Sequence, residues 1–129
     1  MLTIEVDFGS HRPVYRQIAE QLRGLIAKGE VADGQELPGV RQLAASIGIN
    51  LNTVAKAYRI LADEGLLDLR HGSRARVLGG ASAVAPEVDE LERQLADVVS
   101  RLVLHGRGRE EVQAFFDNAI ERFFERSDR

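Results

Sequence analysis

The chain has 129 residues, of which 44% are hydrophobic and 29% charged, so it has room for one small domain plus an appendage but not for a large catalytic barrel. It contains no cysteine, which excludes disulfides, thiol nucleophiles and cysteine-ligated zinc. No apolar run approaches the roughly 20 residues that a membrane crossing needs, and no signal-peptide pattern opens the chain, so we expect a cytoplasmic protein without membrane association.

The net charge of −3 is unevenly distributed along the chain. Residues 1–78 hold ten Lys or Arg against nine Asp or Glu, whereas residues 79–129 hold seven against eleven. Within residues 37–62 the only charged side chains are Arg41, Lys56 and Arg59, and residues 70–76 add three arginines. A chain that is acidic overall therefore keeps two basic stretches, as contact with a phosphate backbone would require.

The N-terminal part of the chain predicts a short arm followed by a helix. Residues 4–8 alternate apolar and polar side chains, which indicates an extended segment. A helix is then expected from Pro13 to about Lys28, because proline suits the first turn, apolar residues recur at helical spacing and Gly29 follows. Residues 31–35 contain Asp-Gly and have the composition of a turn.

The middle of the chain predicts a helix-turn-helix followed by a hairpin. A short helix over residues 40–47 and a second over residues 51–64 are separated by Gly48-Ile49-Asn50, in which Asn50 suits an N-cap. The second helix has one apolar face, and its other face carries Asn52, Lys56 and Arg59. After Gly65, residues 66–69 and 75–78 are expected to form two strands around a basic turn, which together make a wing.

The C-terminal part predicts a small-residue linker over residues 79–86 and two helices, over residues 86–104 and about 109–126. A hairpin of this size cannot cover its own apolar side chains, so either a second copy or the first domain has to cover them. A homodimer is the simplest solution, and we expect the hairpin to form one. The residues expected at the dimer interface are Leu91, Leu95, Val98, Leu102, Phe115, Phe116, Ile120, Phe123 and Phe124.

These elements predict a mainly α fold with a small β wing. The expected organisation is a winged helix-turn-helix domain over residues 1–78, the linker over residues 79–86 and a two-helix dimerisation segment over residues 87–129.

Several blocks of sequence carry a family resemblance. They are residues 13–18 (PVYRQI), 37–44 (LPGVRQLA), 48–61 (GINLNTVAKAYRIL), 64–67 (EGLL) and 70–72 (RHG). In this order and spacing, residues 12–78 resemble the GntR family of transcription regulators. The short C-terminal segment is similar to that of the YtrA-type subfamily, whose members use it to dimerise.

The resemblance implies a sequence-specific DNA-binding regulator, expected to be a repressor, that binds a palindromic operator in double-stranded DNA as a homodimer. It implies that Arg41 contacts DNA, that residues 51–56 enter the major groove and that His71 and Gly72 form the tip of the wing. The residues predicted to bind DNA are Tyr15, Arg41, Leu51, Asn52, Thr53, Lys56, Arg59, His71, Gly72, Arg74 and Arg76.

Four positions depart from the family pattern. Gly39 stands where a serine is common, Leu51 stands where an arginine often reads a base, and Arg74 and Arg76 replace a glycine and an aromatic residue of the wing. Leucine cannot make the bidentate contact of arginine with guanine, although it could touch a thymine methyl group. The added arginines are expected to strengthen contacts with phosphate or a narrow groove.

Other interpretations of the same residues stay open. Lys56 and Arg59 could lie on a solvated helix face, Tyr15 could belong partly to the core, and the basic residues of the wing could only keep a hairpin in solution. The winged helix could also serve protein–protein interaction without DNA binding, which the acidic C-terminal half would favour. The three histidines lie far apart and no catalytic motif is present, so we expect no enzyme, metal or cofactor. The sequence identifies no small-molecule effector.

Overall fold

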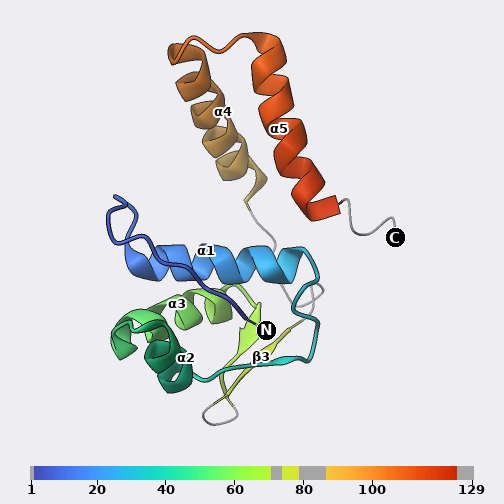
Figure 1. The fold of residues 1–129 in the computed structure, drawn as a ribbon. Coiled ribbons are helices and arrows are strands. Elements are labelled where there is room, and N and C mark those ends of the chain that lie inside the picture. The colour runs from blue at the N-terminus through green and yellow to red at the C-terminus, as the bar shows by residue number, and fades with distance from the viewer. Residues whose placement is uncertain (1, 71–73, 79–86, 125–129) are drawn as a thin grey trace. The chain divides into compact units, whose positions relative to one another are not determined.

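A computed structural model describes residues 2–70, 74–78 and 87–124 (Figure 1). The chain divides into two compact units, residues 1–84 and 85–129. The elements are α1 (Val14–Ala27), β1 (Glu36–Leu37), α2 (Val40–Ile47), α3 (Leu51–Asp63), β2 (Leu67–Asp68), β3 (Ala75–Val77), α4 (Val88–Leu104) and α5 (Arg109–Phe124). The fold class is the one predicted, mainly helical with a small antiparallel sheet.

The core of the first unit lies between its three helices and the sheet, where α1 and α2 both pack against α3 (Figure 1). The largest side chains that are fully buried there include Ile18 and Leu22 from α1 and Tyr58 and Leu61 from α3. Their spacing of three or four residues puts each pair on one helix face. Burial of this shared face, rather than the intrinsic helix propensity of such short segments, holds the helices in place.

The connection between α2 and α3 forms as the sequence predicts. Gly48 ends α2 in the left-handed conformation, with φ of 70°, which glycine adopts without the steric penalty of a side chain. Asn50 caps α3, because its Oδ1 accepts a hydrogen bond of 2.8 Å from the backbone N–H of Asn52. The helix α3 ends at Asp63, one residue earlier than predicted.

The sheet has the strand order β1-β3-β2, with both pairs antiparallel. Leu37, Leu67, Ala75 and Val77 face the core and are buried. The strand β1 was not predicted, because two residues are too few to show an alternating pattern. The wing strands are shorter than the predicted residues 66–69 and 75–78, and the wing tip, with His71 and Gly72, lies outside the described residues.

The N-terminal arm runs antiparallel along α1 instead of joining the sheet (Figure 1). Gln17 Oε1 accepts a hydrogen bond from the Asp7 N–H, and its Nε2 donates to the carbonyl oxygens of Asp7 and Arg12, each at 2.9 Å. One turn further along, Gln21 pairs in the same way with the N–H and carbonyl of Glu5. Two glutamine amides on one helix face thus give the arm the partners that a neighbouring strand would supply.

The second unit is a hairpin of α4 and α5, with Gly106 at φ of 84° in the turn between them. The helix α4 begins at Val88 rather than at Pro86, because Glu87 is extended and Asp89 and Glu90 occupy the first turn, where acidic residues are favoured. The predicted linker over residues 79–86 and the predicted end of α5 beyond residue 124 lie outside the described residues.

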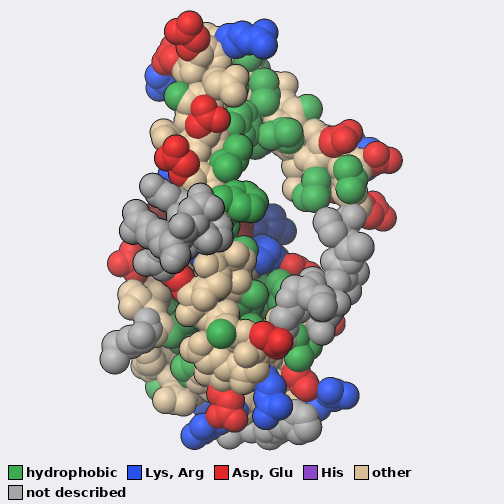
Figure 2. Space-filling view, turned by 90° about the vertical axis from the view of Figure 1, so that its right-hand side faces the viewer, with side chains coloured by type: hydrophobic (Ala, Val, Ile, Leu, Met, Phe, Trp, Pro, Cys, Tyr) green, Lys and Arg blue, Asp and Glu red, His purple; other side chains and the backbone are tan. Residues whose placement is uncertain are grey.

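The hairpin has no buried residue among those that the structure describes. Leu95 and Phe115 are each 50% exposed, and apolar side chains line the facing sides of the two helices (Figure 2). Of the residues predicted for dimerisation, Leu102 and Phe116 are half-buried, and the exposed ones are Leu91, Leu95, Val98, Phe115, Ile120, Phe123 and Phe124. Within the described part of the chain, no helix is long and apolar enough to cross a membrane.

Candidate nucleic-acid interface

The helix pair α2 and α3 presents one polar surface to solvent. Arg41 is exposed in the first turn of α2, and Leu51, Asn52, Lys56 and Arg59 are exposed along α3. Thr53 is half-buried on the first turn of α3. The opposite face of α3 carries the buried side chains, so the core fixes which residues point outward. We call these six residues the α2–α3 surface.

The α2–α3 surface is positive because its cations are not paired with any acidic side chain that the structure describes. Residues 37–62 contain no Asp or Glu, and within the described residues Arg41, Lys56 and Arg59 form no ion pair. Elsewhere in the first unit, Arg12 pairs with Glu20, and Arg23 Nη2 lies 2.6 Å from Glu64 Oε2. The hydrogen-bond donors of these three cations are therefore available to an external anion.

The arginines of the wing, in contrast, lie beside carboxylates. Arg74 Nη1 donates to Glu36 Oε2 at 2.7 Å, and Arg70 makes two hydrogen bonds of 3.0 Å with Asp68. Arg76 stands in register between Glu36 and Asp68 on the outer face of the sheet. The hydrogen bond from Arg74 lowers the pKa of Glu36, with the charge of Arg76 a smaller cause.

The wing is therefore less basic than its sequence indicates. Residues 70–76 contain no acid, but the fold brings two carboxylates to them, one of them 38 residues away along the chain. Figure 2 shows basic and acidic side chains next to one another on the first unit, at the lower edge of the view. The sequence gives no signal for Glu36, because its contact exists only once β1 has paired with β3.

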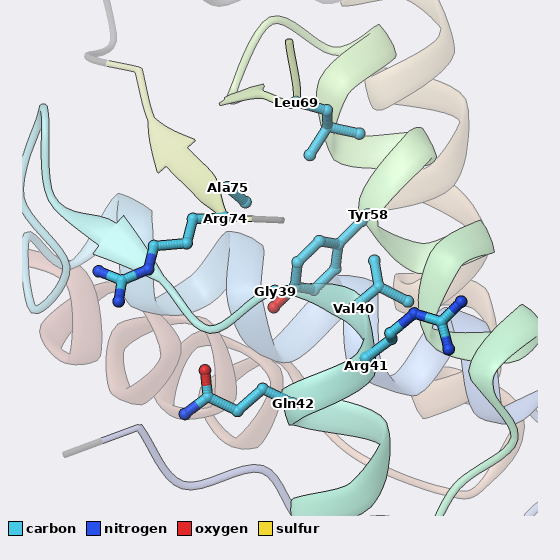
Figure 3. A pocket seen from close by; sticks show the side chains of 8 residues that line it. All are labelled: Gly39, Val40, Arg41, Gln42, Tyr58, Leu69, Arg74 and Ala75. Carbon is cyan, nitrogen blue, oxygen red and sulfur yellow. The ribbon is translucent and has the colours of Figure 1, made fainter. Parts of the chain in front are cut away.

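A hollow of about 520 Å³ lies between the start of α2 and the wing (Figure 3). Arg41 and Arg74 lie on opposite sides of it with their guanidinium groups directed away from each other, and Gln42 lines it from α2. Gly39 is the N-cap of α2 and supplies no side-chain hydrogen bond to the end of the helix. The hollow thus has an arginine on each side and the positive end of a helix beside it, which suits the phosphate backbone of a polymer lying across the surface.

Tyr58 forms the floor of this hollow and was not among the predicted site residues (Figure 3). Its hydroxyl donates a hydrogen bond of 2.6 Å to the carbonyl of Pro38, which fixes the chain just before α2. Burial raises the pKa of Tyr58 to about 12, so the hydroxyl stays protonated and remains a donor. Gln42 was also not predicted, although its position next to Arg41 in the first turn of α2 is a signal for it.

Tyr15 connects α1 with the α2–α3 surface. It lies in the first turn of α1, is half-buried and packs against the core. The Lys56 Nζ lies over its ring, 3.9 Å from the centroid. The structure thus places Tyr15 both at the core and beside a cation of the surface.

Comparison with known proteins supports one family. The model of the bacterial regulatory proteins of the gntR family matches residues 14–77. The HTH-type transcriptional repressor YtrA of Bacillus subtilis is 44% identical over 69 residues, which are 54% of this chain and 53% of YtrA. The chain thus matches about half the length of that relative.

Solved structures show the same fold. A transcriptional antiterminator from Listeria monocytogenes matches with a TM-score of 0.84 over 92% of this chain and 90% of its own, at 24% identity. YtrA from Sulfolobus acidocaldarius, a GntR-family transcription factor, matches with a TM-score of 0.61 and 36% identity over 75% of this chain and 97% of its own. The DNA-binding domain of AraR, solved in complex with operator ORX1, matches with a TM-score of 0.52 and 27% identity over 60% of this chain and 99% of its own. From the family model, the YtrA similarities and the shared winged helix, we conclude that this chain belongs to the GntR family of bacterial regulatory proteins.

Proposed function

We propose that this chain is a transcriptional repressor that binds a palindromic operator in double-stranded DNA as a homodimer. The observation that carries the proposal is the α2–α3 surface, where Arg41, Lys56 and Arg59 are exposed and form no ion pair within the described residues. A helix-turn-helix places the start of its second helix in the major groove, and Asn52 has both the donor and the acceptor that pair with adenine there.

The wing and the hollow have separate roles in this proposal. Arg41 and Arg74, on opposite sides of the hollow, would each contact a backbone phosphate, which sets the orientation of the protein on the duplex. Arg74 has to exchange Glu36 for its phosphate, so its contribution to affinity is smaller than that of an unpaired arginine. Phosphate contacts then come mainly from α2 and α3, and the wing adds less than its arginine content indicates.

The homodimer is supported by the hairpin, which has apolar side chains on α4 and α5 but no buried residue among those described. A second copy of the hairpin offers the same apolar surface in return, as a two-fold interface requires. Two DNA-binding units related in this way contact half-sites about 34 Å apart, or one helical turn, which is why the operator is expected to be palindromic.

The proposal is tested by selecting DNA from a random pool with the full chain and then titrating the selected duplex at several salt concentrations. The three cations of the α2–α3 surface in each of two protomers would contact roughly six phosphates, which gives a slope of log K against log salt of about −5. Arg41→Ala should weaken binding and make the slope less steep by about 2, because two contacts are lost per dimer.

Arg93→Ala is the matched control, since Arg93 is an exposed arginine of α4 that pairs with Glu90 at 2.8 Å. It should leave both affinity and slope unchanged. A selection that recovers no preferred sequence, or a complex whose affinity ignores salt and Arg41→Ala, would overturn the proposal. A monomer without affinity for duplex DNA would instead support a winged helix that binds another protein.

A further inference from the structure

We infer that Tyr15 is a positioning residue for DNA binding, whose ring holds the Lys56 ammonium on the α2–α3 surface where it can meet a backbone phosphate. The inference rests on the proposed function and assigns Tyr15 a role through Lys56 rather than a phosphate contact of its own. The observation that carries it is the distance of 3.9 Å between Lys56 Nζ and the centroid of the Tyr15 ring.

The ring of Tyr15 is itself held in place. Tyr15 lies in the first turn of α1, packs against the buried core and is only half-exposed. The helices α1 and α3 are packed together, so the position of the ring relative to α3 is set by the core. A side chain fixed from behind in this way offers one face to solvent, and Lys56 lies over that ring.

Lys56 is a side chain that gains from such a support. Lysine carries a compact charge on a flexible four-carbon chain, which samples many rotamers when nothing holds it. A cation over the face of a tyrosine is attracted by the negative face of the ring. The ring therefore restricts the ammonium to one place before any DNA is bound, so that less conformational freedom is lost on binding.

The ring orders the lysine without cancelling its charge. In the wing, Glu36 and Asp68 also hold arginines, but they do so with a negative charge that opposes a phosphate. Tyrosine is neutral, and an ammonium above a ring keeps hydrogen-bond donors directed toward solvent. Among the described residues, Lys56 is the cation of the α2–α3 surface that lies over an aromatic ring.

The test uses the full chain and the operator selected by the wild type. Tyr15→Phe keeps the ring and removes the hydroxyl, so its affinity should lie within about twofold of the wild type. Tyr15→Leu keeps an apolar side chain against the core but removes the ring face, and should weaken binding by about threefold to tenfold. Lys56→Met removes the charge and should also make the salt slope less steep by about 2 per dimer.

The double variant separates positioning from a structural role. If Tyr15 acts through Lys56, Tyr15→Leu should have no further effect on affinity in the Lys56→Met background. A purely structural loss would weaken binding equally in both backgrounds. In the free protein, the ε-methylene protons of Lys56 should be shifted upfield by the ring in the wild type and in Tyr15→Phe, but not in Tyr15→Leu.

The outcomes distinguish this inference from the proposed function. A wild type that binds no duplex DNA overturns both. If the wild type binds DNA and Tyr15→Leu binds with the same affinity, the positioning role alone is overturned. The same holds if Tyr15→Leu lowers the affinity equally with Lys56 and with Met at position 56. If Tyr15→Leu does not fold, phenylalanines of increasing fluorine content at position 15 keep the ring shape while weakening its negative face. Affinity should then fall stepwise with fluorination, and no change across the series would overturn the inference.

Discussion

At the scale of single residues, the carboxylate of Glu36 restrains the wing. It accepts the hydrogen bond of Arg74 and lies in register with Arg76 across the sheet. In the proposed complex with DNA, this charge would oppose the phosphate and hold the arginine that we expect to contact it. Glu36→Gln should therefore strengthen binding to duplex DNA severalfold and make the salt slope steeper, which a salt titration measures.

The effect of Glu36→Gln should persist in mild acid. Because Arg74 lowers the pKa of Glu36, the carboxylate stays charged below the range in which an ordinary glutamate takes up a proton. Glu110→Gln is the matched control, since Glu110 is exposed in the second unit. Equal affinities of the Glu36 and Glu110 variants would show that the wing carboxylate does not restrain binding.

Tyr58 should give the folded state a dependence on alkaline pH. Its pKa is raised by burial to about 12, so the folded state holds the proton more tightly than the unfolded state does. The resulting stability is fully present below the ordinary tyrosine pKa of about 10 and is lost as the pH rises from there toward 12. Urea unfolding of the wild type between pH 8 and pH 11 should show this loss.

Tyr58→Phe should remove this part of the pH dependence. It should also lower the free energy of unfolding at neutral pH by about 1 to 2 kcal/mol, because the Pro38 carbonyl loses its donor. A variant whose unfolding free energy still fell to the same extent above pH 10 would contradict the assignment to Tyr58.

At the scale of elements, local signals in the sequence were enough to predict where the helices lie. The bounds of α2 agree with the prediction to the residue, because Gly48 and the Asn50 cap mark both sides of the turn in the sequence itself. The strand β1 could not be predicted, since it exists only by pairing with β3, and its two residues carry no periodic signal.

The candidate site likewise has a part that the sequence predicts and a part that it does not. Helical periodicity predicts which side chains of α3 point outward, but the partners of the wing arginines depend on contacts distant in sequence.

Two asparagines at the start of α3 are expected to differ in role, because Asn50 caps the helix and Asn52 is exposed on the α2–α3 surface. Asn50→Ala removes the helix cap and should lower the free energy of unfolding by about 1 kcal/mol. Asn52 is exposed, and its side chain makes no hydrogen bond within the described residues. Asn52→Ala should therefore leave urea unfolding unchanged while weakening operator binding. The opposite pattern would show that the two residues have exchanged roles.

At the scale of the whole molecule, the hairpin of α4 and α5 is the part through which we propose that two copies of the chain assemble. Leu95 is 50% exposed on α4 in a unit without buried residues among those described. Leu95→Glu puts a charge where we expect the second copy, so sedimentation should show a monomer. Affinity for the full operator should fall to that for one half-site, because the two DNA-binding units are no longer linked and each binds its half-site alone.

Gln94→Glu is the control for Leu95→Glu, since it adds the same charge to an exposed polar position beside it. It should remain a dimer with unchanged operator affinity. The circular dichroism of both variants should remain that of a folded, mainly helical protein. A Leu95→Glu protein that sediments as a dimer would move the interface away from this face.

The glutamine pairing of the N-terminal arm leaves a trace that amide exchange with heavy water can detect. The N–H groups of Glu5 and Asp7 each donate to a glutamine side chain, whereas the intervening N–H of Val6 donates to none within the described part of the chain. Deuterium uptake should therefore alternate from one residue to the next, slow at 5 and 7 and fast at 6. Such an alternation is the signature of an edge strand, produced here by a helix, and replacing Gln17 with Leu should erase it at Asp7 while sparing Glu5.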